Sequence, residues 1–439
     1  MARRPFPCSG FYLLLVLASM PILHGYSIGQ HEQAFAFNSI NGAGPQSTLI
    51  ADAAGNLYGT ASEGGSLLQC GNGSGCGVVF QFIPPSQPGG QWAENTLYSF
   101  LGGADGAVPN GSLVFDKAGN LYGTTQNGGA CNPEGCGTIF ELSPPPQPGG
   151  SWTETVLYSF GGLSGDTPMA GLIIDSGGNL FGTTSSAGPF AGGTIFELSP
   201  ASQPGGQWAE TTLYNFGAFQ GDAAGPVAPL VFDSAGNLYG TTAGGGSNPQ
   251  FCTNPPEFGC GTVFELSPPT QPGGPWTEAI LYNFGSVPKD GMAPFEGLTI
   301  TPSGALLGTT PTGGLNYGVV FALAAPSSPG GTWQYGIPYR FTGGADGATP
   351  YSALAIVTGR SPVLYGTTKR GGAGGEGTVF QLTPPSPGGS WVETPVYNFS
   401  GANDGGRPLS GVTVYNFALY GTTAVGGSHG YGTVFRLSR

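Results

Sequence analysis

The tetrapeptide Leu57-Tyr58-Gly59-Thr60 decides the fold, because the chain repeats it six more times along its 439 residues. The copies lie about 55 to 68 residues apart, a spacing slightly longer than that of common propeller blades. They begin at Leu57, Leu121, Leu180, Leu238, Leu306, Leu364 and Leu419, and the fifth copy has Leu307 in place of the aromatic residue. A period of this length predicts a chain built from seven copies of one structural unit.

Three further segments accompany each tetrapeptide. A second signature follows it after a Gly-rich loop, as in Gly77-Val78-Val79-Phe80, and recurs at Gly137, Gly193, Gly261, Gly318, Gly377 and Gly432. A third segment runs from Trp to Phe, as in Trp92 to Phe100, and all six tryptophans start such a segment. The fourth is a short apolar run such as Leu113-Val114-Phe115. All four are runs of β-branched and aromatic residues bounded by Gly, Pro or Asp, which predicts strands rather than helices.

The turn residues agree with a strand prediction. The pattern Asp-x-x-Gly-Asn separates the short apolar run from the tetrapeptide at residues 52–56, 116–120, 175–179 and 233–237. Its Asp can accept backbone N–H bonds, and its Gly can take the positive φ that a tight hairpin turn requires. The Pro- and Gly-rich loop before each Trp ends one strand and starts the next.

Four strands in each of seven units predict an all-β, seven-bladed β-propeller with four-stranded blades. The seventh unit has no Trp-type strand after Gly432. The segment from Ala34 to Phe37, followed by Asn41-Gly42, resembles Leu97 to Phe100 followed by Asp105-Gly106. We therefore expect the N-terminal strand to complete the last blade and close the ring. An open solenoid is the alternative, but in an open solenoid the N-terminal strand would not meet the incomplete seventh unit.

Composition and charge narrow the class of protein. Gly and Pro, 83 and 40 residues, fall at the period of the repeat, and charged residues make up only 8% of the chain. A net charge of -13 with eleven scattered Lys and Arg residues argues against nucleic acid as a partner, because phosphate binding needs clustered cations.

The N-terminus has the pattern of an export signal. Arg3 and Arg4 precede an apolar run from Phe11 to Leu23 that is too short to span a bilayer comfortably. We expect residues 1–27 to be a signal peptide and residues 28–439 to form one propeller domain, soluble after signal removal and monomeric. A retained N-terminal anchor is the competing interpretation.

The repeats resemble those of the bacterial GloVer tandem-repeat proteins over residues 45–437. The resemblance rests on Gly-Thr-Val-Phe-Glu-Leu at residues 261–266 together with Asn-Leu-Tyr-Gly-Thr-Thr at residues 237–242. It implies export and surface display, with no settled biochemical activity to carry over.

Six cysteines outside the signal form three close pairs in the loops between the second and third strands. They are Cys70 with Cys76, Cys131 with Cys136, and Cys252 with Cys260. In an exported chain this arrangement predicts three local disulfides. A zinc site is the alternative, but no His lies near the pairs.

No catalytic constellation is visible in the sequence. Eighteen of the 24 acidic residues stand at repeat positions, such as the Glu of Trp-x-Glu, whereas catalysis needs a unique asymmetric set. The remaining acids, among them Glu296 and Glu376, have no adjacent basic partner in the sequence. An enzyme should instead show non-repeating polar side chains that converge in the central channel.

Two function classes remain. The first is a non-catalytic binding or scaffolding propeller, secreted or at the cell surface, whose partner is an extracellular glycan or an envelope protein. The second is a propeller lyase or hydrolase that acts on extracellular polysaccharide.

Six acidic residues stand in Asp-Gly or Gly-Asp turns on the loops between units. They are Asp105, Asp166, Asp222, Asp290, Asp346 and Asp404. We expect these loops to open on the same face as the disulfide loops, and binding residues concentrate on such loops over a rigid scaffold. A ring of carboxylates could hold Ca²⁺ or accept sugar hydroxyls. Alternatively, each Asp only satisfies the backbone of its own turn.

Overall fold

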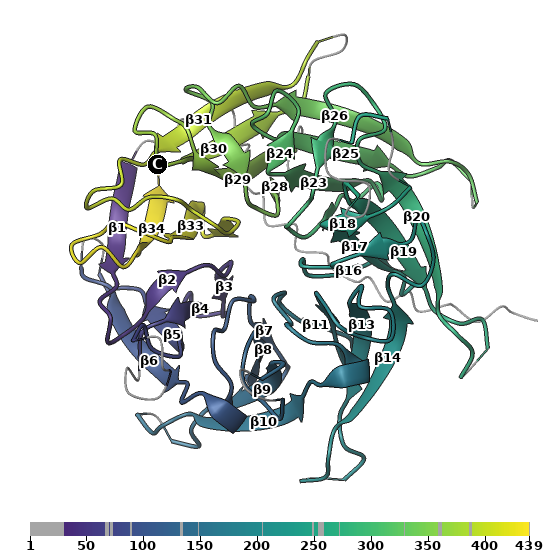
Figure 1. Ribbon diagram of the computed structural model, residues 1–439. Coiled ribbons are helices and arrows are strands. Elements are labelled where there is room, and N and C mark those ends of the chain that lie inside the picture. The colour runs from purple at the N-terminus through teal and green to yellow at the C-terminus, as the bar shows by residue number, and fades with distance from the viewer. Residues whose placement is uncertain are drawn as a thin grey trace, which may run out of the picture.

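The computed structural model describes residues 30–438, apart from residues 66–69, 71–72, 88–89, 132–134, 148, 204, 248–249, 253–258, 272, 329, 359–361 and 386–388. The expected signal peptide, residues 1–27, lies outside the described residues. The described chain forms seven four-stranded antiparallel blades arranged as a ring (Figure 1). It contains two short 3-10 turns, η1 (Gly103–Asp105) and η2 (Gly162–Ser164), and no α-helix in the part that the structure describes. No described helix is long and apolar enough to cross a membrane.

Each blade takes its strands in sequence order from the channel outward. Blade 1 consists of β3 (Ile50–Ala51), β4 (Leu57–Glu63), β5 (Val78–Ile83) and β6 (Ala93–Ser99). Blade 2 consists of β7 (Val114–Phe115), β8 (Leu121–Thr125), β9 (Thr138–Ser143) and β10 (Thr153–Ser159). Blade 3 consists of β11 (Ile173–Ile174), β12 (Leu180–Thr184), β13 (Thr194–Ser199) and β14 (Ala209–Asn215).

The remaining blades repeat this order, and blade 7 takes its outer strand from the N-terminus. Blades 4 to 7 consist of β16 (Val231–Phe232), β17 (Leu238–Thr242), β19 (Thr262–Ser267) and β20 (Thr277–Asn283); β22 (Thr299–Ile300), β23 (Leu306–Thr310), β25 (Val319–Ala324) and β26 (Gln334–Arg340); β28 (Ala355–Val357), β29 (Val363–Arg370), β30 (Thr378–Thr383) and β31 (Val392–Asn398); and β32 (Thr413–Tyr415), β33 (Ala418–Thr423), β34 (Thr433–Ser438) and β1 (Gln30–Ala36).

Four blades carry short extra strands, which pair either with the second strand or with each other. They are β2 (Ala43–Pro45) with β4, β27 (Ala348–Pro350) with β29, β15 (Ala223–Ala224) with β18 (Gly244–Gly245), and β21 (Gly291–Met292) with β24 (Thr312–Gly313).

The closed propeller predicted from the sequence is confirmed. Strand β1 pairs antiparallel with β34, and Phe35 stands opposite Val434 in the register. The ring of Phe37 then packs on Phe80 of blade 1, with centroids 5.1 Å apart. The N-terminal strand therefore finishes blade 7 and also contributes to the boundary with blade 1.

The two sequence signatures occur together because the Phe ring of the second occupies the space beside the Gly of the first. A Cβ on Gly182 would lie 2.6 Å from the ring of Phe196, which stands opposite it on the next strand. The same relationship holds in every blade, at Gly59, Gly123, Gly182, Gly240, Gly308, Gly366 and Gly421. Only glycine leaves room for the phenylalanine that fills the blade, since no real Cβ approaches other heavy atoms this closely.

A threonine hydroxyl links each blade to the next around the channel. Thr124 of blade 2, for example, donates to the carbonyl oxygen of Ala170 in blade 3 at 2.9 Å. Equivalent bonds start from Thr60, Thr183, Thr241, Thr309, Thr367 and Thr422, and the last one reaches Pro45 and closes the circle. The threonine of the tetrapeptide thus joins units rather than serving its own strand.

The core lies between blades. Tyr58 and Val79 of blade 1 are buried with Leu121 and Phe140 of blade 2 in one cluster, which also contains Phe100 from the start of the crossing between these blades. Six other clusters repeat this arrangement around the ring. Since each blade buries its face only against its neighbours, stability depends on the whole ring being closed.

Candidate functional site

The loops between blades and the loops between second and third strands lie side by side, as predicted. In blade 2, the amide of Gly129 donates to the carbonyl oxygen of Gly103 at 2.8 Å, and this joins the two loops. Corresponding bonds occur in all seven blades, including Gly188 to Gly162 and Gly372 to Gly344. We call the surface formed by these two sets of loops the loop face.

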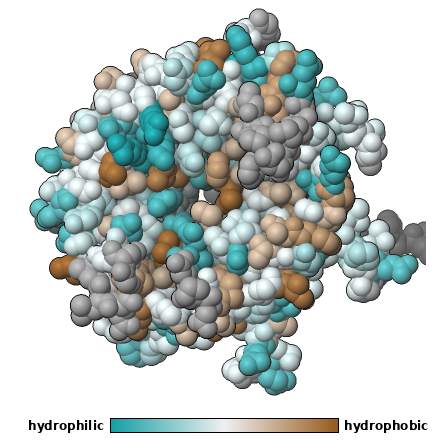
Figure 2. Space-filling model, in the orientation of Figure 1, coloured by the Kyte–Doolittle hydropathy of each residue, from teal (hydrophilic) through white to brown (hydrophobic). Residues whose placement is uncertain are grey.

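The loop face exposes most of the large apolar side chains that are exposed in the described chain. Nine of these twelve side chains stand on its loops, with exposed fractions from 37% to 74%. They are Ile40, Leu101, Leu163, Phe190, Phe219, Phe251, Leu315, Tyr317 and Tyr431. In Figure 2, brown residues are scattered over one face of the ring, which is hollowed at its centre. Most of the large apolar side chains that the described chain exposes therefore lie on the loop face.

A hollow of about 790 Å³ lies on the loop face at blade 4. Its described lining includes Phe219, Gln220, Asp222 and Ser247. Phe219 is 61% exposed, whereas Asp222 is buried. The hollow therefore presents an aromatic ring to solvent and keeps its carboxylate within the loop.

Five of the six predicted Asp residues share one role in the turn that leads into the next blade. Asp105 accepts hydrogen bonds from the hydroxyl of Tyr98 at 2.6 Å and the amide of Leu101 at 2.6 Å. Asp222, Asp290, Asp346 and Asp404 accept equivalent bonds from a Tyr hydroxyl and a loop amide. The carboxylates are therefore engaged with their own turns. Whether they also bind a ligand stays a prediction.

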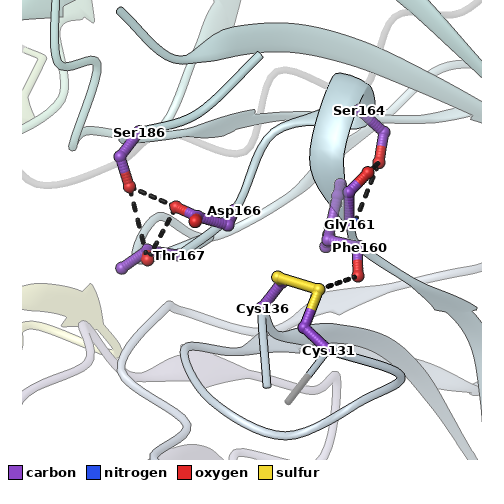
Figure 3. Close-up of a disulfide and its surroundings, with 8 residues drawn as sticks. All are labelled: Cys131, Cys136, Phe160, Gly161, Ser164, Asp166, Thr167 and Ser186. Carbon is purple, nitrogen blue, oxygen red and sulfur yellow. Dashed lines mark hydrogen bonds between the residues drawn. A yellow bond between two sulfur atoms is a disulfide. The ribbon is translucent and has the colours of Figure 1, made fainter. Parts of the chain in front are cut away.

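Asp166 does not belong to this set, although its Gly-Asp context suggested that it does. Ser164 takes the corresponding place and bonds the amide of Gly161. Asp166 lies two residues further on and accepts from the hydroxyls of Thr167 and Ser186 (Figure 3). At the first boundary the place is taken by Asn41, which accepts from the amide of Asn38 at 2.9 Å. The crossing into blade 3 therefore has a different spacing from the others, and a ligand-binding role for Asp166 stays a prediction.

The three predicted disulfides are present. Cys70–Cys76, Cys131–Cys136 and Cys252–Cys260 have Cα–Cα separations of 5.4, 5.4 and 5.7 Å. The sulfur of Cys131 also lies 3.5 Å from the carbonyl oxygen of Phe160 at the start of the next crossing (Figure 3). Each bridge therefore fixes a loop-face segment against the blade that carries it.

A non-repeating cluster stands where blades 5 and 6 meet. The rings of Phe295 and Tyr351 stack with centroids 5.7 Å apart, and the Lys369 ammonium lies 5.2 Å from the Tyr351 centroid. Glu296 follows Phe295 and interacts electrostatically with Tyr351. Burial raises the pKa of Glu296 to about 8, so this carboxyl is largely protonated at neutral pH. The repeat has no acid at this position in other blades, where Ala170 and Ser352 stand.

Basic side chains extend this cluster toward blade 7. Burial first, and then the charges of Arg370 and Arg407, lower the pKa of Lys369. Arg407 pairs with Glu376 at 2.8 Å. Glu376 has no basic neighbour in the sequence, and the fold supplies one by bringing Arg407 to it from 31 positions away. We call Phe295, Glu296, Tyr351, Lys369, Arg370, Glu376 and Arg407 the basic–aromatic cluster.

The sequence contained one signal for this cluster. Lys369, Arg370 and Arg407 are three of the seven Lys and Arg residues that the structure describes. Their positions in the last third of the chain were visible, but their convergence was not. His429 is exposed and contacts only the neighbouring Ser428 hydroxyl among the described side chains, at 3.0 Å. Within the described residues, no three His, Cys, Asp or Glu side chains are grouped for metal binding.

Comparisons with known proteins bear on the family and the fold. The family model described as the Gloeobacter/Verrucomicrobia repeat matches the chain twice in tandem, over residues 67–253 and 251–439. A solved protein of unknown function from Dyadobacter fermentans is 12% identical, with a TM-score of 0.43, covering 83% of this chain and 96% of that one. A comparison with curated proteins gives no match.

A second solved structure is PorZ of Porphyromonas gingivalis, described as an essential surface component of the type-IX secretion system. It is 12% identical, with a TM-score of 0.47, and the match covers 92% of this chain and 48% of PorZ. The present chain thus spans about half the length of PorZ. Likenesses at this level carry no argument about function.

Proposed function

Because the chain belongs to the Gloeobacter/Verrucomicrobia repeat family, we propose that it is an exported, non-catalytic propeller that binds a ligand at the cell surface or outside the cell. The three disulfides support export, since such bridges persist in oxidising compartments. The observation that carries the binding role is the concentration of nine exposed large apolar side chains on the loop face.

The basic–aromatic cluster supplies the charge preference of this face. Lys369 and Arg370 have no acidic partner within ion-pair distance among the described residues, and Arg407 is paired once. Together they place a local excess of positive charge on a protein whose net charge is -13. Because screening at physiological ionic strength acts over about 8 Å, the charges of the cluster itself matter more to a ligand bound there than the net charge of the whole chain. We therefore propose an acidic extracellular saccharide as the ligand class.

A binding experiment tests this proposal. The mature chain is applied to an array of neutral and uronic-acid glycans, beside the variant Lys369→Gln. The matched control is Lys117→Gln, which removes one positive charge in the turn of residues 116–120, away from the loop face. Binding of acidic glycans that Lys369→Gln weakens and Lys117→Gln preserves supports the proposal. Equal loss in both variants, or no preference for acidic glycans, contradicts it.

A second candidate function is supported by the chemistry of Glu296. Glu296, an acid with a raised pKa, interacts with Tyr351, and Lys369 lies over the Tyr351 ring. This is a non-repeating set of the kind expected of a polysaccharide lyase or hydrolase. Incubating the protein with acidic polysaccharides and measuring new reducing ends separates the two functions. Product formation that Glu296→Gln abolishes would identify an enzyme, whereas binding without products supports the non-catalytic propeller.

A further inference from the structure

One pairing of side chains recurs at six of the blade boundaries. One partner stands two residues after the Trp of an outer strand, and the other comes from the crossing that leads into that blade. Hydrogen bonds join Asn41 with Glu94, Asp290 with Tyr335, and Glu210 with Tyr158, which lies on β10 rather than in the crossing. Asp105, Asp222 and Asp346 act electrostatically on Glu154, Glu278 and Glu393. We call each of these contacts a boundary clasp.

Three boundary clasps contain an evident proton donor. The Tyr335 hydroxyl donates to Asp290, and the Asn41 amide donates to Glu94 at 3.3 Å. The Tyr158 hydroxyl donates to Glu210 at 3.4 Å. In these clasps a group that holds its hydrogen over the whole physiological pH range faces a carboxylate.

The other three boundary clasps bring two carboxyl groups together. Glu154 stands opposite Leu142 in the sheet register, as Tyr335 stands opposite Leu323, so Glu154 occupies the place of the Tyr335 donor. The Oε1 atoms of Glu154, Glu278 and Glu393 are buried and have no hydrogen-bond partner. A buried oxygen without a partner is costly if it is an ionised acceptor. It is satisfied if it carries a proton and donates it.

Acidic and phenolic groups surround these carboxyls, and no cation acts on them in the described structure. Glu154 faces Asp105 from the crossing and Tyr98 from β6. Glu278 faces Asp222 and Tyr214, and Glu393 faces Asp346 and Tyr339. In each case the Tyr hydroxyl already donates to the Asp. The only hydrogen left to join the two carboxyl groups is one on the Glu.

We propose that Glu154, Glu278 and Glu393 hold a proton near neutral pH and donate it to Asp105, Asp222 and Asp346, so that three blade boundaries are fastened by shared protons and loosen as the pH rises. Tyr335 performs the same function permanently at the boundary between blades 4 and 5.

The sign of the pH dependence follows from the folded and unfolded pKa values. Burial first, and then the facing Asp, raise the pKa of Glu154 and Glu278 to about 7 and that of Glu393 to about 8. An unfolded Glu has a pKa of about 4.3. The clasps therefore contribute fully below about pH 4.3 and are lost as the pH rises through about 7 to 8. Each clasp makes unfolding at most about tenfold more favourable per pH unit in this window, and solvent screening reduces the effect.

Calorimetric melting of the mature protein between pH 5 and pH 9 tests the proposal. The triple variant Glu154→Gln, Glu278→Gln and Glu393→Gln keeps the shape of each side chain and supplies an amide donor at every pH. We expect the wild-type melting temperature to fall from pH 5 to about pH 8 and then to level off, because the folded and unfolded Glu side chains are both ionised above the folded pKa. We expect the variant to be more stable than wild type at pH 9, with a flatter profile. The control is Glu141→Gln, Glu197→Gln and Glu265→Gln, which neutralises three acids at another repeat position, on the third strands of blades 2, 3 and 4.

Two results would overturn the proposal. One is an unchanged pH profile in the first triple variant. The other is stabilisation of the wild type, but not of that variant, by millimolar Ca²⁺ at pH 8, which would assign the carboxyl pairs to a cation instead of a proton. If the triple variant failed to fold, the single variants Glu154→Gln and Glu393→Gln would each be required to remove part of the pH dependence.

Discussion

The amide of Phe37 donates a hydrogen bond to the carbonyl oxygen of Gly432, with an N···O distance of 3.0 Å. The same bond recurs in the other six blades, for example from Phe100 to Gly77 and from Phe160 to Gly137. In those blades both partners belong to one local unit of sequence. In blade 7 they come from opposite ends of the chain, so ring closure uses an ordinary blade contact made between distant segments.

Closure predicts that removing the N-terminal strand destabilises the whole ring. Deletion of residues 28–40 leaves β34 as an unpaired edge and removes Phe37, which is fully buried against Phe80 and Phe82. We expect aggregation or a large fall in melting temperature by calorimetry. A synthetic peptide of residues 28–40 added in trans should restore stability. A truncated protein that melts like the full chain would contradict the closed ring.

The contact between glycine and phenylalanine predicts a coupled pair of substitutions. In Gly182→Ala the new methyl group meets the Phe196 ring at 2.6 Å, so we expect a loss of about 1–3 kcal/mol from overpacking. The double variant with Phe196→Leu should lose less than the sum of the single variants, because the smaller side chain makes room. Chemical denaturation measures both. Strictly additive losses would show that the two positions do not interact.

The disulfides predict a definite peptide map. Proteolysis of the unreduced mature protein followed by mass spectrometry should recover the pairs Cys70–Cys76, Cys131–Cys136 and Cys252–Cys260 and no free thiol. Each bridge should stabilise its loop by about 2 to 2.5 kcal/mol in the loop-entropy model. Bridges between blades, or free thiols, would be incompatible with this pairing.

The turn carboxylates predict a separation of stability from binding. Alanine at Asp105 and Asp346 leaves the amides of Leu101 and Thr342 without their acceptors, so each substitution should cost about 1–3 kcal/mol. Asparagine at both positions keeps an acceptor oxygen, as Asn41 does at the first boundary, and should preserve more of the stability.

Calcium titration and glycan binding of the Asn variants then assign the role of the acidic positions. Unchanged binding would leave the carboxylates structural, and lost binding at preserved stability would place the ligand there. Asp166→Asn provides the comparison, since this residue stands outside the repeated turn role.

The sequence by itself determined the repeat, the blade and the closure. These follow from local interactions: Asp52 accepts the amides of Ala54 and Asn56 within five residues, and each Gly–Phe contact joins adjacent strands of one unit. Such interactions require the same residue types at the same spacing in every copy, so they can be recognised from the sequence repeat. The disulfide pairing was equally accessible because each pair spans one short loop.

Only the tertiary structure decided which side chains meet across blade boundaries. Lys369 and Arg407 converge because the crossing into blade 7 contacts the loop that follows β29, where the Arg407 amide donates to the carbonyl oxygen of Glu376. Glu154 interacts with Asp105 because the crossing into blade 2 brings Asp105 near its outer strand. Likewise, Ser164 replaced Asp166 through a shift of two residues that leaves the repeat pattern intact. Contacts of this kind depend on the curvature of the closed ring and on the depth of burial, and neither quantity is encoded in the spacing of residues along the chain.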